Sequence, residues 1–116
     1  MLLKQGEVYW VSLNPIEGSE IKGTSKEGQR PCVIVSPNVL NKYLNTVIIA
    51  PCTTNLKNTP FRAKVNSLEK TSEVALDQIR AVDKLRLGEK MGALNRQELQ
   101  KCLEILRNIF SSSENK

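Results

Sequence analysis

The chain has 116 residues, and none of them is histidine. Histidine is a frequent zinc ligand and the most common acid–base catalyst. Its absence therefore excludes the usual zinc sites, Ser-His-Asp triads and pairs of imidazoles acting as acid and base. No tight cluster of carboxylates takes its place. The sequence predicts neither a metal ion nor a cofactor.

Long apolar runs and aromatic residues are also scarce. No run approaches the roughly 18 residues of a membrane-spanning helix, and no signal peptide is recognisable. We therefore expect a soluble, cytoplasmic protein without a membrane partner. Because the apolar share of 40% includes only one Trp, two Tyr and two Phe, the core is expected to be aliphatic.

The chain has only three cysteines, which is an odd number. Cys32 and Cys52 lie in apolar runs, Cys102 lies on an apolar helical face, and no two share a CxxC spacing. This pattern is typical of small buried hydrophobic residues, not of disulfides or metal ligands.

The length of the chain and its charge indicate the number of domains and the kind of partner. A chain of 116 residues is predicted to form one domain over residues 1–116, with a polar tail at 111–116 that frays. Seventeen basic and twelve acidic residues give a net charge of +5. This excess suits a polyanionic partner or an acidic peptide, although many basic proteins bind neither.

The central stretch is Gly28 to Pro37. Within it, residues 32–35 form a short, β-branched apolar run between prolines, which predicts a strand buried on both faces. Pro31 favours an extended backbone at Arg30, so the arginine is expected at the mouth of this strand. A cation held there by a rigid element is suited to binding a phosphate.

The other segments read mainly as strands. Strands are predicted at residues 7–13, 31–36, 46–51 and 61–65, and over 72–82 with an interruption near 77–78. A helical turn is expected at 38–43, long polar loops at 16–29 and 52–60, and a short glycine-punctuated segment at 85–94. The strand at 46–51 is almost wholly apolar, which predicts a central position.

The last element is predicted to be an amphipathic helix. Asn95 and Glu98 resemble a capping box. The apolar positions that follow recur at helical spacing and are Leu99, Cys102, Leu103, Leu106, Ile109 and Phe110. Successive strands and one terminal helix predict an α+β fold with a mostly antiparallel, strongly curved sheet. If its two most apolar strands pair antiparallel, Arg30 meets Thr53 and Thr54 at one end.

The order of several short motifs resembles one family, the MazF/PemK (Kid-type) toxins. The motifs are Gly6-Glu7-Val8-Tyr9-Trp10-Val11, Asn14-Pro15, Gly18-Ser19-Glu20, Arg30-Pro31, Ser36-Pro37, Ala50-Pro51-Cys52-Thr53-Thr54-Asn55, Pro60-Phe61, Leu76-Asp77-Gln78 and Ile79-Arg80-Ala81-Val82-Asp83-Lys84. Each motif alone is weak, but their order is specific and extends from Gly6 to about Leu106.

The resemblance implies an SH3-like barrel extended by helices, a fold shared with the gyrase poison CcdB. It also implies a homodimeric, metal-independent endoribonuclease that cuts single-stranded RNA at short sequence motifs. A cognate antitoxin would inhibit it by placing an acidic, disordered C-terminal segment in the RNA groove. Operator DNA would be bound only through the antitoxin complex.

The resemblance also assigns residues by position. Arg30 and Thr53 match an arginine and a threonine at the cleaved phosphate. Ser19 and Glu20 match a loop pair implicated in activity, and Asp77 matches a carboxylate proposed as base in some members. The positions expected to contact RNA are Ser19, Lys22, Gln29, Thr54, Asn55, Gln78 and Arg80.

Two departures from the family pattern bear on the base. The loop between Glu20 and Arg30 is about five residues longer than usual. Ala75 stands where some members have a second catalytic arginine. The first departure affects the position of Glu20, and the second affects the role of Asp77.

Metal-free RNA cleavage uses the 2′-hydroxyl of the substrate as nucleophile and leaves a 2′,3′-cyclic phosphate and a 5′-hydroxyl. Such an attack needs a base and stabilisation of the phosphorane. Without histidine, the candidate bases are Glu20 and Asp77. Arg30 keeps its proton and is expected to clamp the phosphate, with the Thr53 hydroxyl as a second donor.

Other readings remain open. A gyrase poison like CcdB would need an apolar, tryptophan-bearing C-terminus, but the chain ends in Ser-Ser-Ser-Glu-Asn-Lys. A non-catalytic SH3-like binding module would be inert towards RNA. Thr53 and Thr54 also suit a simple turn, and Glu20 suits a solvated loop. Trp10, Tyr9 and Phe61 could stack on bases, although Trp10 is expected in the core.

Overall fold

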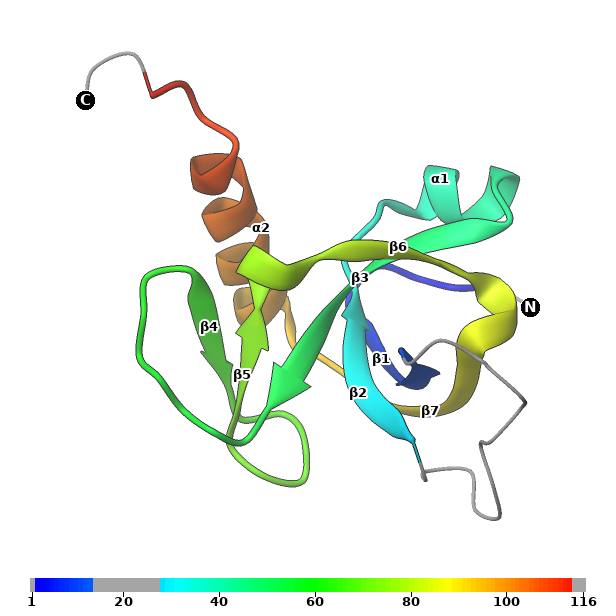
Figure 1. The fold of residues 1–116 in the computed structure, drawn as a ribbon, viewed down its shortest axis with the longest axis horizontal. Coiled ribbons are helices and arrows are strands. Elements are labelled where there is room, and N and C mark those ends of the chain that lie inside the picture. The colour runs from blue at the N-terminus through cyan, green and yellow to red at the C-terminus, as the bar shows by residue number, and fades with distance from the viewer. Residues whose placement is uncertain (1, 14–27, 114–116) are drawn as a thin grey trace.

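The computed structural model describes residues 2–13 and 28–113, and Figure 1 shows their arrangement. Seven strands, two α-helices and two short 3-10 turns follow one another in these ranges. The strands are β1 (Glu7–Ser12), β2 (Gln29–Ile34), β3 (Thr46–Thr53), β4 (Arg62–Val65), β5 (Ser72–Ala75), β6 (Arg80–Asp83) and β7 (Leu87–Ala93). The helices are α1 (Asn38–Tyr43) and α2 (Arg96–Ile109), and the 3-10 turns are η1 (Leu76–Gln78) and η2 (Lys84–Arg86).

The strands form an antiparallel sheet in the order β4-β5-β3-β2-β1-β7, and β6 pairs with β3 off this path. β3 is central, as predicted. Its second edge is shared: Thr46–Ile49 pair with β6, whereas Cys52 and Thr53 pair with β5. The turn η1 lies between these two partners, which explains the predicted interruption near residues 77–78. The sheet curls (Figure 1), and β4 and β7 are its two ends.

β2 begins two residues earlier than predicted and ends two residues earlier. Gln29 and Arg30 pair with Ser12 and Val11, so Arg30 is part of the strand. At the other end, the amides of Val35 and Ser36 both donate to the carbonyl of Ile48, at 2.9 and 3.3 Å, which ends the regular ladder.

The segment at 85–94 is more regular than its glycines suggested, because it contains the seven-residue strand β7. Its pairing with β1 shifts register between Val8–Gly92 and Tyr9–Lys90. One β7 residue, Met91, is therefore extra at this point. Such bulges twist a strand and redirect a side chain.

Both faces of the sheet are buried. One core cluster includes Val8 and Val33 with Cys102 and Ile105 of α2. The alternate positions of the same strands, including Tyr9 and Ile34, belong to a second cluster. This confirms the prediction that β2 is buried on both faces, because alternate side chains of a strand point to opposite faces.

The C-terminal helix α2 begins with the predicted capping box. Asn95 Oδ1 accepts from the amide of Glu98 at 2.8 Å, and Glu98 Oε1 accepts from the amide of Asn95 at 3.1 Å. The prediction that Phe110 faces the core is wrong, because Phe110 lies beyond the last helical residue and is 72% exposed. Ile105 is buried instead. No helix in the described part of the chain is long and apolar enough to cross a membrane.

Candidate functional site

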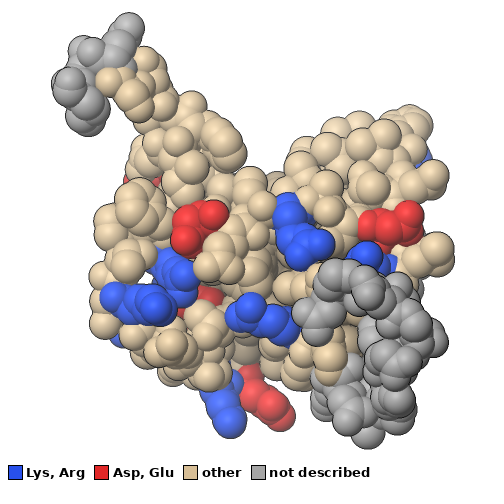
Figure 2. Space-filling view, in the orientation of Figure 1, with Lys and Arg blue, Asp and Glu red and all other residues tan. Residues whose placement is uncertain are grey.

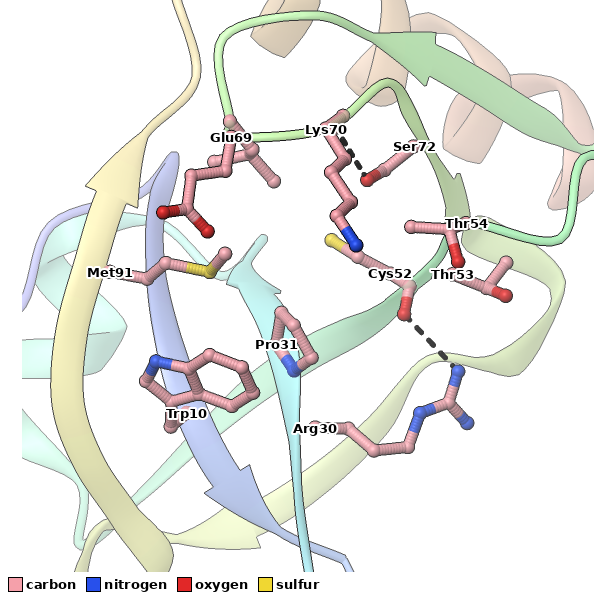
Figure 3. Close-up of a pocket in the computed structure, with 11 residues that line it drawn as sticks. Trp10, Arg30, Pro31, Cys52, Thr53, Thr54, Glu69, Lys70, Ser72 and Met91 are labelled. Carbon is pink, nitrogen blue, oxygen red and sulfur yellow. Dashed lines mark hydrogen bonds between the residues drawn. The ribbon is translucent and has the colours of Figure 1, made fainter. Parts of the chain in front are cut away.

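The ends of β2 and β3 bring Arg30 and Thr53 together. These strands pair antiparallel with Cys32 opposite Pro51, so the beginning of β2 lies beside the end of β3. The Arg30 guanidinium donates from Nη2 to the carbonyl oxygen of Cys52 at 3.2 Å, as the dashed line in Figure 3 shows. The expectation that the two positions share one end of the sheet is confirmed.

Arg30 and Thr53 line the mouth of a cavity of about 370 Å³. Figure 3 shows the arginine and both threonines on one side, and Trp10 and Met91 on the other. Arg30 and Thr54 are exposed and Thr53 is half-buried. A solute that entered the cavity would thus meet a guanidinium and two hydroxyl groups.

Thr53 also closes a turn, because its Oγ1 accepts from the amide of Asn55 at 3.0 Å. A threonine hydroxyl has one hydrogen to donate and two lone pairs that accept. The hydrogen bond from Asn55 occupies one lone pair and leaves the hydroxyl hydrogen for another acceptor. Thr53 can therefore stabilise the turn and still donate a hydrogen bond to a ligand in the cavity.

Glu73 was missed by the sequence reasoning, although it organises the loop after Thr53. Its side chain is 1% exposed, and its two oxygens accept from the amides of Lys57 (2.9 Å) and Asn58 (2.8 Å). These two hydrogen bonds hold the pKa of the Glu73 carboxyl below its ordinary value. Glu73 pairs with Thr53 across the ladder. The available signal was a single carboxylate in the otherwise uncharged segment 72–76.

Of the two candidate bases, only Asp77 lies in the described part of the chain. Asp77 forms an ion pair with Arg62, with 3.4 Å between Oδ1 and Nε, and does not line the cavity. Glu20 lies outside the described residues, as do Ser19 and Lys22.

The remaining candidates are dispersed. Asn55 and Gln78 are exposed, and Arg80 donates to the carbonyl of Leu13 at 3.4 Å. Gln29 packs against Gly88 of β7, where an added Cβ would lie 2.9 Å from the Gln29 amide nitrogen. The Gln29 amide oxygen is buried and accepts no hydrogen bond from the described part of the chain.

The prediction that Trp10 lies in the core is wrong. Trp10 is half-buried and borders the cavity instead of filling the core. The reason is its register: Trp10 stands opposite Pro31 on β2, next to the bulge of β7. Lys70 and Glu69 of the loop between β4 and β5 also line this cavity and were not predicted.

The electrostatic setting of the site is mixed. On the face drawn in Figure 2, Lys and Arg side chains lie across the middle of the molecule, with isolated acidic groups around them. The three cysteines are free and buried, and burial raises the pKa of each thiol to about 12. Cys52 in the cavity wall is thus protonated near neutral pH. Within residues 2–13 and 28–113, no three His, Cys, Asp or Glu side chains are grouped to hold a metal ion.

Comparison with known proteins identifies the family to which the chain belongs. A family model described as PemK-like, MazF-like toxin of type II toxin-antitoxin system matches residues 4–110. The chain therefore belongs to this family of toxins.

Within the family, the chain is a homologue of the endoribonucleases MazF and EndoA. Endoribonuclease MazF of Staphylococcus epidermidis is 35% identical over 104 residues, covering 84% of this chain and 82% of that protein. Endoribonuclease EndoA of Bacillus subtilis (strain 168) is 31% identical over 113 residues, covering 92% and 93%.

A solved structure agrees with the fold. It is an endoribonuclease in complex with its cognate antitoxin from Mycobacterial species. It matches with a TM-score of 0.76 at 24% identity, covering 91% of this chain and 92% of that one. The predicted α+β fold, with a mostly antiparallel sheet and a C-terminal helix, is confirmed as MazF-like.

Proposed function

We propose that this chain is a toxin endoribonuclease that cuts single-stranded RNA at a short sequence motif without a metal ion. The observation that carries the proposal is the juxtaposition of Arg30 and Thr53 at the mouth of the cavity. The names of the two endoribonuclease relatives support it.

In the proposed reaction, the 2′-oxygen attacks the adjacent phosphorus as a base removes its proton. The P–O5′ bond then breaks and the leaving oxygen takes up a proton, which yields a 2′,3′-cyclic phosphate and a 5′-hydroxyl. Glu20 and Asp77 remain the proposed bases. For Asp77 to act, its carboxylate would have to leave Arg62 or be approached by the RNA.

Arg30 would stabilise the phosphorane. A guanidinium carries five N–H donors, and its hydrogen bond to the Cys52 carbonyl fixes the direction of the plane while other donors remain for a phosphate. Stabilisation then grows as negative charge develops on the phosphate oxygens, which lowers the barrier and not merely the dissociation constant. Thr53 would add a neutral donor beside it.

The partners and assembly are proposed from the family. A cognate antitoxin would inhibit the chain with an acidic, disordered C-terminal segment that complements the net charge of +5. The solved relative in complex with its cognate antitoxin supports such a partner. A homodimer, closure of the sheet into an SH3-like barrel, a cytoplasmic location, and operator DNA binding only through the antitoxin complex belong to the same proposal.

The test is single-turnover cleavage of a long RNA, with and without excess EDTA, by the wild type, Arg30→Lys and Arg96→Lys. Arg30→Lys keeps the charge but loses the planar two-pronged geometry, so its rate should fall by about 10²-fold or more. Arg96, exposed at the start of α2, is the matched control and should leave the rate unchanged.

Three outcomes would overturn the proposal. Equal rates for the wild type and Arg30→Lys would make Arg30 an ordinary surface charge. Loss of cleavage in EDTA by a protein that stays folded would contradict the metal-free mechanism. A wild type that left RNA intact would instead fit a gyrase poison or a non-catalytic binding module.

A further inference from the structure

The cavity beside Arg30 is the entrance to a longer trough. From Arg30 and Thr53 it extends to Trp10 and Met91. A second hollow shares Trp10, Leu68, Glu69 and Met91 with the first and continues to Glu89 and Lys90. The first cavity alone, at about 370 Å³, falls in the range of about 300–1,000 Å³ that is usual for small-ligand sites. The cleavage chemistry proposed above uses only its mouth.

The walls of the first cavity are mainly apolar. Trp10 of β1 stands opposite Pro31 of β2. Met91, displaced from regular pairing by the bulge in β7, brings its sulfur towards the same space (Figure 3). An indole, a proline ring and a thioether in this arrangement suit a flat aromatic ligand, because single-stranded RNA is recognised largely by stacking of its bases on aromatic side chains.

The charges at the rim are separated. The Lys70 ammonium lies towards Cys52 and Thr54, on the side of Arg30, whereas the Glu69 carboxylate lies towards Met91 (Figure 3). Two cations at one end suit the phosphate of a nucleotide. A carboxylate at the other end accepts hydrogen bonds and repels acceptors, so it suits a base edge that donates from an exocyclic amino group.

We propose that this trough binds the base of a nucleotide flanking the cleaved phosphate and prefers a base with an exocyclic amino group over uracil. Trp10 provides the stacking surface, and Glu69 accepts from the amino group. Uracil has a single N–H between two carbonyl oxygens, and these oxygens would face the Glu69 carboxylate. The inference rests on the proposed function, because Arg30 sets where the phosphate lies.

The test uses binding without cleavage. The probes are 2′-O-methyl pentanucleotides of sequence UUXUU, which lack the nucleophile. Their binding to the full chain is measured by anisotropy of a 5′ label. Adenine, cytosine or guanine at X should give at least about tenfold tighter binding than uracil, the scale of one hydrogen bond to a charged group. Because Trp10 is the one tryptophan, its fluorescence should change on binding.

Two matched variants locate the preference. Glu69→Gln should reduce the ratio between amino-bearing bases and uracil to nearly one, since a glutamine amide both donates and accepts. Glu104→Gln removes the same charge from an exposed position of α2, outside the trough, and it should keep the preference.

Two results would overturn the base-binding proposal: equal binding of all four probes, or the same preference in the wild type and Glu69→Gln. These results are independent of RNA cleavage. If the wild type showed the base preference but cut no RNA, the proposed function would fall and the trough would stand as a base-binding site.

Discussion

At the scale of the single residue, the hydroxyl group of Thr53 is able to serve both the turn and the proposed site. The oxygen accepts from the amide of Asn55 and so shapes the turn that follows β3, while the hydrogen remains to donate to a phosphate. Arg30, fixed by the Cys52 carbonyl, faces the same space. Two residues that serve one phosphate should depend on each other.

The first prediction follows from this dependence. Thr53→Ala should slow single-turnover cleavage by about 10²-fold, and Thr53→Ser, which keeps the hydroxyl, should restore most of the rate. In the double variant Arg30→Lys/Thr53→Ala the loss should be smaller than the product of the two single losses. Fully multiplicative losses would show that the two residues act on separate steps.

At the scale of the element, the loop between β3 and β4 depends on a strand that it does not belong to. Glu73 of β5 accepts from the amides of Lys57 and Asn58, and Asn58 has a positive φ of 56°. A loop in this conformation needs its amides satisfied, because buried unpaired groups are costly. Glu73 thereby fixes the segment that follows Thr53 and Thr54.

The second prediction concerns the pH dependence that Glu73 creates. Its pKa is lowered in the folded chain, so between the folded and unfolded values the unfolded state binds more protons and stability rises with pH. The contribution is complete above the unfolded pKa of about 4.3 and is lost as the pH falls through the folded value. Glu73→Gln lacks this titrating group. Its free energy of unfolding should therefore fall less than that of the wild type between about pH 6 and about pH 3, a range that spans the pKa of an unfolded glutamate.

Urea denaturation at each pH would measure this difference. Glu104→Gln, at an exposed position of α2, is the control and should keep the wild-type pH dependence. If Glu73→Gln kept the wild-type pH dependence of unfolding, the Glu73 carboxylate would not stabilise the loop. In the cleavage assay at neutral pH, Glu73→Ala should be slower than Glu73→Gln, because glutamine retains one acceptor for the two amides.

At the scale of the whole molecule, the net charge of +5 bears on both proposed partners. RNA and an acidic antitoxin segment are both polyanions, and both would meet the basic side chains that lie across the face in Figure 2. Contacts of this kind release counterions and weaken as salt rises. The two partners are therefore expected to compete.

The third prediction is a shared salt dependence. The logarithm of the RNA binding constant should fall linearly with the logarithm of salt concentration, and Arg30→Ala should reduce the slope by about 0.7, the value for one phosphate contact on a single strand. Arg96→Ala should leave the slope unchanged. An inhibitory segment that proved neutral or basic, or that inhibited without displacing RNA, would contradict the competition.

Most of the fold could be predicted because its signals are local. The apolar alternation of β1, the β-branched run in β2 and the capping box at Asn95 each depend on neighbouring residues alone. The errors fall where the chain departs from regular geometry. Phe110 continued the helical spacing after the helix had ended, and the bulge that frees Met91 has no signature in a glycine-punctuated segment.

By itself, the sequence determined which residues we propose for the chemistry: Arg30 at the mouth of one predicted strand and Thr53 just after another, in a chain without histidine. Residue type and spacing suffice for these, because propensity and periodicity act over a few residues. Only the tertiary structure decided what lies beside them. Trp10, Glu69 and Met91 come from three different segments and meet through strand register, one bulge and one loop. Such long-range contacts depend on how the whole sheet packs, which no local pattern specifies.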